Sequence, residues 1–519
     1  MRKTRILWTD DEIEVLKPHL FFLREKGYEI ETCSNGTDTV DLVRQNIYDL
    51  VFLDEHMPCL SGIETLRLIR EIRPEIPVVM ITKSEEEDIM EAAIGSEIAD
   101  YLIKPVKPNQ ILLAIKKNLE QKKLVTAKTT VDYRQEFSRI SGLINKAAQP
   151  ADWIEIYRKL VFWETELEKS SDAGMTEILK MQENEASVSF SRFISSNYLN
   201  WLEPSCDSRP LLSQNLLREK VFPKLEKSKP VFFILIDNMR YDQWKTIASE
   251  LTGLMRTSED DLYFSILPTA TQFSRNAIFA GLMPLSISET MPELWVDEDD
   301  EEGKNNFEEE LLRRHVARAG LNIKWSYSKI NNNQEGRKVN ERISSLMAND
   351  LNVLVYNFVD MLSHARTEVS LIRDLAIDEK AYRSLTRSWF LHSPLFELLN
   401  LLAAKNTRII FSTDHGTVMV RNPVKIVGDR NTTANLRYKM GRNLDYDPSK
   451  VFEIRNPEKA WLPKNNISSR YIFATNKDYL VYFNNYNQFA AYYRDTFQHG
   501  GISMQEMLLP VITLEPAGL

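Results

Sequence analysis

VFFILIDNMRYDQW, residues 231–244, decides the fold of the larger part of this chain, because six apolar residues run directly into an aspartate. VLVYNFVDMLSH, residues 353–364, and RIIFSTDHGTV, residues 408–418, repeat the pattern. Apolar runs of this kind are typical of strands buried in a parallel sheet, and ligands of such sheets bind outside the carboxyl ends of the strands. The polar residues that we expect at this edge are Asp237, Asp360, His364, Asp414 and His415.

A fourth segment adds a histidine to this set. In QHGGISMQEMLLP, residues 498–510, His499 precedes two glycines, which let the backbone approach a metal or a phosphate closely. Imidazole and carboxylate together favour Zn²⁺ or Mn²⁺ over Mg²⁺. A structural role is the alternative for any single histidine, but the combination predicts a two-metal hydrolytic site. Its predicted ligands are Asp237, Thr271, Asp360, His364, Asp414, His415 and His499.

Thr271 is the predicted catalytic nucleophile. It lies in SILPTATQFSRNAIFAG, residues 265–281, where a Pro and Thr cluster precedes a helical pattern. The alternative is that Thr271 or Thr269 caps that helix. Beside two metal ions, however, a threonine hydroxyl loses its proton near neutral pH and attacks phosphorus, while the second ion stabilises the leaving oxygen.

The first 121 residues carry a second, separate set of polar side chains. Apolar runs alternate with helical spacing there, which predicts a parallel sheet with helices on both faces. Asp10, Asp11 and Asp54 follow two of the runs, and three carboxylates in one crevice predict a bound Mg²⁺. Asp54 is the expected phosphoryl acceptor, with Thr82 and Lys104 contacting the phosphoryl oxygens. A single aspartate at a strand end would more simply be a helix N-cap.

Bulk properties bound the remaining possibilities. The chain has 519 residues, a net charge of −9 and three cysteines, and it lacks an apolar run near the ~20 residues needed to cross a bilayer. We therefore expect a cytoplasmic protein in a reducing compartment, without a membrane contact and without a long footprint on duplex DNA. Residues 297–310, DEDDEEGKNNFEEE, are predicted to be a solvated loop.

Three domains are predicted. Residues 1–121 form the first α/β domain, residues 122–205 show only amphipathic helical spacing, and residues 206–519 form a larger α/β domain. Within the last domain, GDRNTTANLRYKMGRNL could hold substrate phosphates, since Arg binds phosphate bidentately. A solvated, charge-balancing loop is the alternative. The predicted substrate-binding residues are Arg430, Arg437, Lys439 and Arg442.

The N-terminal motifs resemble the receiver domain of bacterial two-component response regulators. WTDDE, DEHMP around Asp54, Thr82, and Lys104 preceded by Tyr101 carry the resemblance, and Lys83 departs from the small residue usual there. The resemblance implies a partner histidine kinase, phosphorylation at Asp54 and a switch made of Thr82, Tyr101 and Lys104. It also implies dimerisation through a face within residues 85–120.

The C-terminal motifs resemble the alkaline phosphatase superfamily and, within it, the PglZ domain. DNMRYDQW, PTATQFSR and HGGISMQE carry the resemblance. It implies Thr271 as nucleophile and two zinc ions, and a Thr nucleophile is more typical of the phosphodiesterases of this superfamily than of its phosphoglycerate mutases. One ion would bind Asp237, Thr271, Asp414 and His415, and the other Asp360, His364 and His499.

The three-part order resembles the PorX-type response regulators, a family associated with type IX secretion in Bacteroidota. This resemblance implies a phosphorylation-dependent homodimer, a zinc-dependent phosphodiesterase acting on cyclic and linear oligonucleotides, and contact with a sigma factor. The alternative is a non-catalytic regulator whose metal-containing domain binds a nucleotide, a sigma factor or another partner. A complete set of nucleophile and ligands favours catalysis.

Overall fold

The computed structural model describes residues 4–83, 98–170, 173–226, 229–296, 305–405, 407–429, 432–464 and 466–517. Two compact units make up the chain. The first comprises Met1–Glu136 and Thr165–Thr176, and the second comprises Phe137–Glu164 and Glu177–Leu519. None of the helices in these described ranges combines the length and the apolar character that crossing a membrane requires.

The first unit contains a five-stranded parallel sheet in the order β2-β1-β3-β4-β5. Apolar residues of α1 and of the start of α5 pack on one face, and residues of α2 and α3 pack on the other. The predicted doubly wound sheet is therefore confirmed, and the order brings the ends of β1, β3 and β4 together. The elements are β1 Arg5–Thr9, α1 Ile13–Glu25, β2 Glu29–Cys33, α2 Gly36–Gln45, β3 Leu50–Asp54, α3 Gly62–Ile72, β4 Val78–Thr82, β5 Asp100–Ile103 and α5 Pro108–Lys146.

The middle region is helical, as predicted. It consists of the later part of α5, α6 Pro150–Ser170 and α7 Ala173–Trp201. Within the second unit, Trp153 packs on Phe190 of α7, and Trp201 packs edge-on against Phe264 of the C-terminal α/β part. The proposed division at residues 121 and 205 stays a prediction, and residue 121 falls within α5.

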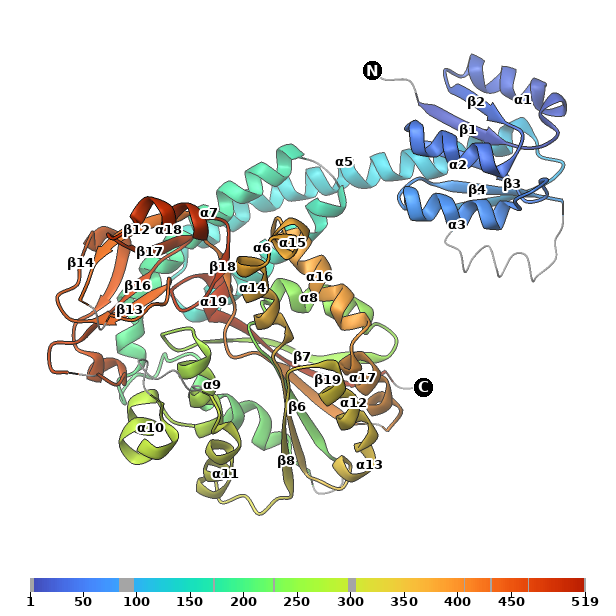
Figure 1. Ribbon diagram of the computed structural model, residues 1–519. Coiled ribbons are helices and arrows are strands. Elements are labelled where there is room, and N and C mark those ends of the chain that lie inside the picture. The colour runs from blue at the N-terminus through green and yellow to red at the C-terminus, as the bar shows by residue number, and fades with distance from the viewer. Residues whose placement is uncertain are drawn as a thin grey trace. The chain divides into compact units, whose positions relative to one another are not determined.

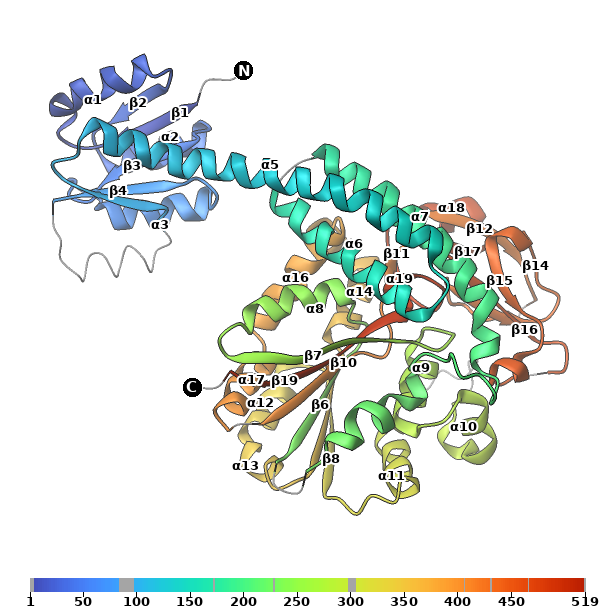
Figure 2. The same ribbon diagram turned by 180° about the vertical axis from the view of Figure 1, so that it is seen from behind.

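The second unit is built on a six-stranded sheet in the order β7-β19-β10-β6-β9-β8. The four strands from β10 to β8 are parallel, whereas β19 runs antiparallel to β10 and to β7. All residues of β6 and β9 are buried, because helices cover both faces. Helices α9, α10 and α11 lie on one side and α8, α12, α16 and α17 on the other (Figure 1), and Figure 2 shows the same layers from behind. The strands are β6 Val231–Ile236, β7 Met255–Phe264, β8 Trp325–Ile330, β9 Leu351–Tyr356, β10 Arg408–Ser412 and β19 Leu508–Pro516.

Smaller sheets of two and three strands flank this core, namely β11-β18, β14-β12-β17 and β13-β16-β15. Their strands are β11 Val418–Met419, β12 Asn422–Val427, β13 Tyr438–Gly441, β14 Asp445–Tyr446, β15 Val451–Ile454, β16 Arg470–Ala474, β17 Asp478–Tyr482 and β18 Phe497–Gln498. The remaining helices are α8 Tyr241–Glu250, α9 Thr271–Ala280, α10 Pro284–Thr290, α11 Glu308–Arg318, α12 Asn333–Glu341, α13 Ile343–Leu346, α14 Phe358–Glu368, α15 Ser370–Leu375, α16 Glu379–Leu391, α17 Pro394–Ala404, α18 Tyr486–Tyr493 and α19 Met504–Met507.

Two expected positions differ from the structure. Asp360 does not end a strand, because β9 stops at Tyr356 and Asp360 lies in the first turn of α14. His499 follows β18, a strand of the two-stranded sheet, instead of a strand of the main sheet. An apolar run fixes where a strand exists, but the turn that follows it depends on tertiary contacts.

The acidic segment is a further correction. Residues 297–304 lie outside the described residues, but Glu308, Glu309 and Glu310 form the first turn of α11. Acidic side chains are favoured at a helix N-terminus, where backbone N–H groups lack partners. Glu308 is also fully buried, with an exposed fraction of 1%, so this part of the segment is no solvated loop.

Gly281 ends α9, the helix that begins with Thr271, and its φ of +61° places it in the left-handed region. A Cβ there would overlap the imidazole ring of His315. Gly281→Ala should therefore cost about 1–2 kcal/mol of unfolding free energy for the backbone and roughly 1–3 kcal/mol more for overpacking. Urea denaturation of the purified protein measures the sum.

Gly253→Ala is the matched control. Gly253 has a φ of +89°, but nothing lies within 4 Å of a Cβ built there. It should show the backbone cost alone, and equal losses for the two variants would contradict the steric part of this account.

Candidate functional site

The first ligand cluster contains Asp237, Asp414 and His415, all buried, with ligand atoms within 4.8 Å of one another. His415 Nε2 lies 3.6 Å from Asp237 Oδ1 and 3.7 Å from Asp414 Oδ2. Thr271 Oγ1 lies 2.9 Å from the same nitrogen. Asp237 Oδ1 is buried without a hydrogen-bond partner, and a bound cation would satisfy this oxygen. These four residues therefore fit a metal ion.

Parallel pairing explains why Asp237 and Asp414 meet. Leu235 of β6 pairs with Ser412 of β10, so the two strands end side by side. The backbone N–H of Met239 then donates to Thr413 Oγ1 at 3.0 Å, which ties the two following turns together. Residues far apart in the sequence thus converge because the sheet register aligns their strands.

The alternative role of the threonines as helix caps does not match the structure. The N-cap of α9 is Ala270, without a side-chain capping bond. Thr271 is the first residue of the helix and shares a hydrogen bond with His415, while Thr269 Oγ1 donates to the carbonyl of Gly501 at 2.9 Å. The hydroxyl of Thr271 therefore faces the ligand cluster.

The second cluster contains Asp360, His364 and His499. Asp360 and His364 lie one turn apart on α14, with 3.4 Å between His364 Nε2 and Asp360 Oδ2. His499 Nε2 lies 3.9 Å from Asp360 Oδ1, and its ring stacks on that of His415 with 4.2 Å between centroids. The structure thus brings all seven predicted ligands into two adjacent clusters.

Backbone carbonyls orient two of the imidazoles. His415 Nδ1 lies 3.2 Å from the carbonyl of Gly416, and His499 Nδ1 lies 3.3 Å from that of Thr269. Each Nδ1–H can donate to its carbonyl, which leaves Nε2 for a metal. Burial lowers the pKa of His499 to about 3, so this ring is neutral and can ligate. The nitrogen and oxygen donors together suit Zn²⁺ better than Mg²⁺.

Arg275 is a site residue that the sequence reasoning missed. It lies one turn after Thr271 on α9 and is fully buried. Its guanidinium contacts Asp237 and donates from Nε to Asp414 Oδ2 at 2.9 Å. Although burial raises the pKa of Asp414, the charge of Arg275 holds it below its usual value. The four-residue spacing from Thr271 is the signal that could have found it.

Glu308 completes the network behind the first cluster. Its Oε1 lies 3.2 Å from Nη1 of Arg275, and its Oε2 lies 3.1 Å from Nζ of Lys329 and accepts from Tyr327. A buried carboxylate needs such partners, since an unpaired one would be strongly destabilising. Glu308 therefore holds Arg275 in place from the side opposite the aspartates.

The predicted substrate-binding residues require a correction. Arg430 lies outside the described residues. Arg437 and Lys439 are buried: Arg437 pairs with Glu506 at 2.6 Å, and Lys439 Nζ donates to the carbonyl of Thr433 at 2.9 Å. Their donors are engaged within the protein, so the structure gives both residues a structural role. Arg442 is half-exposed and pairs with Asp429 at 3.1 Å.

The Arg437 and Glu506 pair nevertheless serves the site. Glu506 Oε1 accepts from the backbone N–H of Gly501 at 2.9 Å, two residues after His499. Gly500, between them, has a φ of +122°, and a Cβ there would clash with the ring of Tyr438. The two glycines thus allow a tight turn that the buried ion pair holds beside the metal ligands.

In the first unit, Asp10, Asp11 and Asp54 form a third cluster with ligand atoms within 4.8 Å. Lys104 Nζ lies 2.8 Å from Asp10 Oδ2 and 3.0 Å from Asp54 Oδ1. Burial, together with Asp10 and Asp11, raises the pKa of Asp54 despite Lys104. A divalent cation would reverse this shift and suits an all-oxygen set.

The other switch residues of this unit lie nearby in the fold. Thr82 is buried at the end of β4, whereas Tyr101 on β5 has an exposed fraction of 40%. Lys83 pairs with Glu12 at 3.1 Å. Residues 85–97 of the predicted dimerisation face lie outside the described residues.

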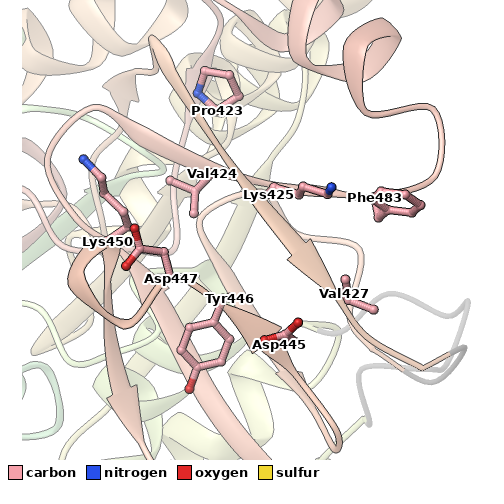
Figure 3. A pocket seen from close by; sticks show the side chains of 9 residues that line it. All are labelled: Pro423, Val424, Lys425, Val427, Asp445, Tyr446, Asp447, Lys450 and Phe483. Atoms are coloured by element: carbon pink, nitrogen blue, oxygen red, sulfur yellow. The ribbon is translucent and has the colours of Figure 1, made fainter.

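A hollow of about 700 Å³ lies on the small sheet around β12 and β14 (Figure 3). Lys425 Nζ lies 4.0 Å from the ring centroid of Phe483 at its rim. Two lysines and two aspartates line the hollow, so its charges balance, and it contains none of the predicted ligands. The arrangement favours neither an anion nor a metal cation.

Three family models match the chain. The model of the BREX system PglZ alkaline phosphatase-like domain matches residues 216–514, more than half of the chain. The PorX response regulator linker domain matches residues 123–202, and the response regulator receiver domain matches residues 6–116. A receiver-type sheet, a helical middle region and an alkaline-phosphatase-like α/β domain thus follow one another.

Individual relatives match the receiver part. The alginate biosynthesis transcriptional regulatory protein AlgB of Pseudomonas syringae pv. tomato is 34% identical over 29% of this chain and 31% of its own. The transcriptional regulatory protein ResD of Bacillus subtilis is 32% identical over 22% of this chain and 47% of its own. The chain therefore spans less than half the length of either relative. A solved receiver domain protein from Clostridium thermocellum is 33% identical, with 23% of this chain and 98% of that chain covered and a TM-score of 0.22.

Arg275→Met should lower the free energy of unfolding of the metal-free protein by about 3–5 kcal/mol, because Asp237 and Asp414 lose their buried counter-ion. Zinc should shrink this loss, since a bound cation supplies the missing positive charge. Chemical denaturation with and without zinc measures both effects.

Arg313→Met is the control, because Arg313 pairs with Glu310 at the surface and should contribute less than about 1 kcal/mol. A zinc-induced gain no larger in Arg275→Met than in the control would contradict this role of Arg275.

Proposed function

The chain belongs to the PglZ family of alkaline phosphatase-like domains, and on this premise we propose that it is a zinc-dependent phosphodiesterase controlled by phosphorylation of its receiver domain. The observation that carries the proposal is the position of Thr271 Oγ1, 2.9 Å from His415 Nε2 and beside two ligand clusters. A nucleophile at a two-metal site is an arrangement that can catalyse phosphoryl hydrolysis.

Thr271 would attack phosphorus through Oγ1, which loses its proton while one ester oxygen leaves as an alcohol, and water would then cleave the phosphothreonine ester. Thr271 is the first residue of α9, where the backbone N–H groups of the first turn lack partners in the helix and favour an anionic phosphoryl group. Asp237, Thr271, Asp414 and His415 would hold one zinc ion, and Asp360, His364 and His499 the other. When bound, the ions would supply Lewis-acid charge that offsets the negative charge developing on phosphorus and its oxygens.

The exposure of the ligands supports one direction of substrate approach. The side chain of His364 is 61% exposed, whereas those of Asp360 and His499 are 19% and 16% exposed. Asp414 and His415 are fully buried. A phosphodiester would therefore enter over α14 and reach Thr271 from the His364 side.

The proposed substrates are cyclic and linear oligonucleotides. The support is the Thr nucleophile and the resemblance to PorX-type regulators, whose linker model matches residues 123–202. We extend the proposal to regulation of type IX secretion in Bacteroidota, with a sensor histidine kinase, a phosphorylation-dependent homodimer and a sigma factor as partners. Mg²⁺ at Asp10, Asp11 and Asp54 would assist phosphorylation of Asp54.

Hydrolysis of bis-(p-nitrophenyl) phosphate by the zinc-loaded protein tests the catalytic proposal. Thr271→Ala should retain zinc and lose turnover by roughly 10³-fold or more, because the attacking oxygen is removed. Thr290→Ala, at the exposed end of the neighbouring α10, is the matched control and should turn over like the wild type. Zinc binding without turnover in the wild type would favour the non-catalytic regulator instead.

Phosphorylation is tested with a small phosphodonor, acetyl phosphate, in the presence of Mg²⁺. The wild type should become labelled and shift from monomer to dimer in light scattering, whereas Asp54→Asn should do neither, because the acceptor oxygen is replaced. Asp41→Asn, at an exposed position of α2, should behave like the wild type. Labelling of Asp54→Asn at the wild-type level would refute Asp54 as the acceptor.

A further inference from the structure

Asn238 contacts both ligand clusters at once. It follows Asp237 directly and is fully buried. Its side-chain Nδ2 lies 3.1 Å from Asp360 Oδ1 in the second cluster, and its backbone N lies 3.4 Å from Asp414 Oδ1 in the first. One residue thus spans the two proposed zinc sites.

The backbone of Asn238 adopts a conformation that few residues accept. Its φ is +63°, in the left-handed region, where Asn is tolerated far better than most side chains. The next residue, Met239, is fixed by the hydrogen bond from its N–H to Thr413 Oγ1. This turn directs the amide across from the end of β6 toward α14.

Hydrogen-bond chemistry fixes which way the amide points. An ionised Asp360 can only accept, so the NH₂ group must face it. Ser363 Oγ lies 3.1 Å from the same nitrogen and donates its own proton to the carbonyl of Asp360 at 2.7 Å, so it also accepts from the amide. Both amide protons are therefore used on α14, while Asn238 Oδ1 stays buried without a partner.

Asn238 Oδ1 has no hydrogen-bond partner within the described part of the protein, so the contacts that favour an asparagine here are the two that its NH₂ group makes on α14. Glycine would relieve the left-handed backbone, and a small apolar residue would avoid the unpaired oxygen. What only the amide supplies is a link from the turn after Asp237 to one oxygen of Asp360. That link leaves Oδ2 of Asp360 beside His364.

We propose that Asn238 is a positioning residue that fixes Asp360 relative to Asp237 and Asp414 and thereby sets the spacing of the two metal sites. This inference rests on the proposed two-zinc function. Loss of the amide would let the Asp360 carboxylate rotate, which weakens zinc binding at the second site. The aspartates of the first site would still contact Arg275. Removal of a hydrogen-bond partner of a metal ligand typically lowers the metal affinity by 10–100-fold.

Asn238→Gly and Asn238→Ala separate the amide from the backbone. Both remove the amide, but only Ala has difficulty with the left-handed conformation. We expect both variants to bind the first zinc like the wild type, to bind the second about 10–100-fold more weakly, and to lose kcat equally with little change in KM. The melting temperature of Asn238→Ala should be lower than that of Asn238→Gly. Chelator competition with zinc counting measures the two affinities.

Ser363→Ala is the matched control, because it removes the other acceptor of the amide and leaves the link to Asp360. The affinity of this variant for the second zinc ion should stay within about threefold of the wild-type value, a much smaller change than the loss expected for the Asn238 variants. Wild-type affinity for both zinc ions in Asn238→Gly would overturn the inference, as would an effect confined to Asn238→Ala.

The wild type separates failure of this inference from failure of the proposed function. Two bound zinc ions without phosphodiester turnover would refute the function while the affinity comparison still tests Asn238. Fewer than two zinc ions in the wild type would refute both.

Discussion

Repulsion among buried carboxylates is the constraint on which the site depends. Asp237 and Asp414 lie within one small volume, and burial raises the pKa of Asp237 well above its usual range. Arg275 offsets this repulsion and is itself held by Glu308. The receiver site uses the same principle, since Lys104 pairs with Asp10 and Asp54. In both places a fixed cation keeps acidic ligands together before any metal arrives.

Much of the fold and the seven proposed ligands could be predicted from the sequence, because apolar runs and the polar residues after them are local signals. Partners distant in the sequence could not be. Nothing local distinguishes Arg437, buried on Glu506, from an arginine that binds phosphate, since its partner lies 69 residues away. The burial of Glu308 could likewise not be predicted from the acidic segment in which it lies, because it depends on the ion pair with Arg275 on another helix.

Exposure varies steeply across the two clusters, and this gradient has a chemical consequence. The first cluster is enclosed, with Asp414 and His415 fully buried, so its electrostatic interactions act in a medium of low dielectric constant. The second includes His364, whose side chain is mostly exposed on α14. The more exposed metal would be the easier one to exchange or to compete for, which makes second-site occupancy the more sensitive to whatever orients Asp360.

Arg275 and Asn238 perform different tasks, and neither residue type could replace the other. A cation at position 238 would compete with the second metal for Asp360, and an aspartate there would add another carboxylate to an acidic site. A neutral amide links Asp360 to the first cluster without changing the charge balance that Arg275 sets. The guanidinium of Arg275 on α9 therefore sets the charge balance, and the amide of Asn238 in the turn after β6 sets the spacing of the two metal sites. The left-handed backbone of Asn238 is the conformation that lets its amide reach Asp360.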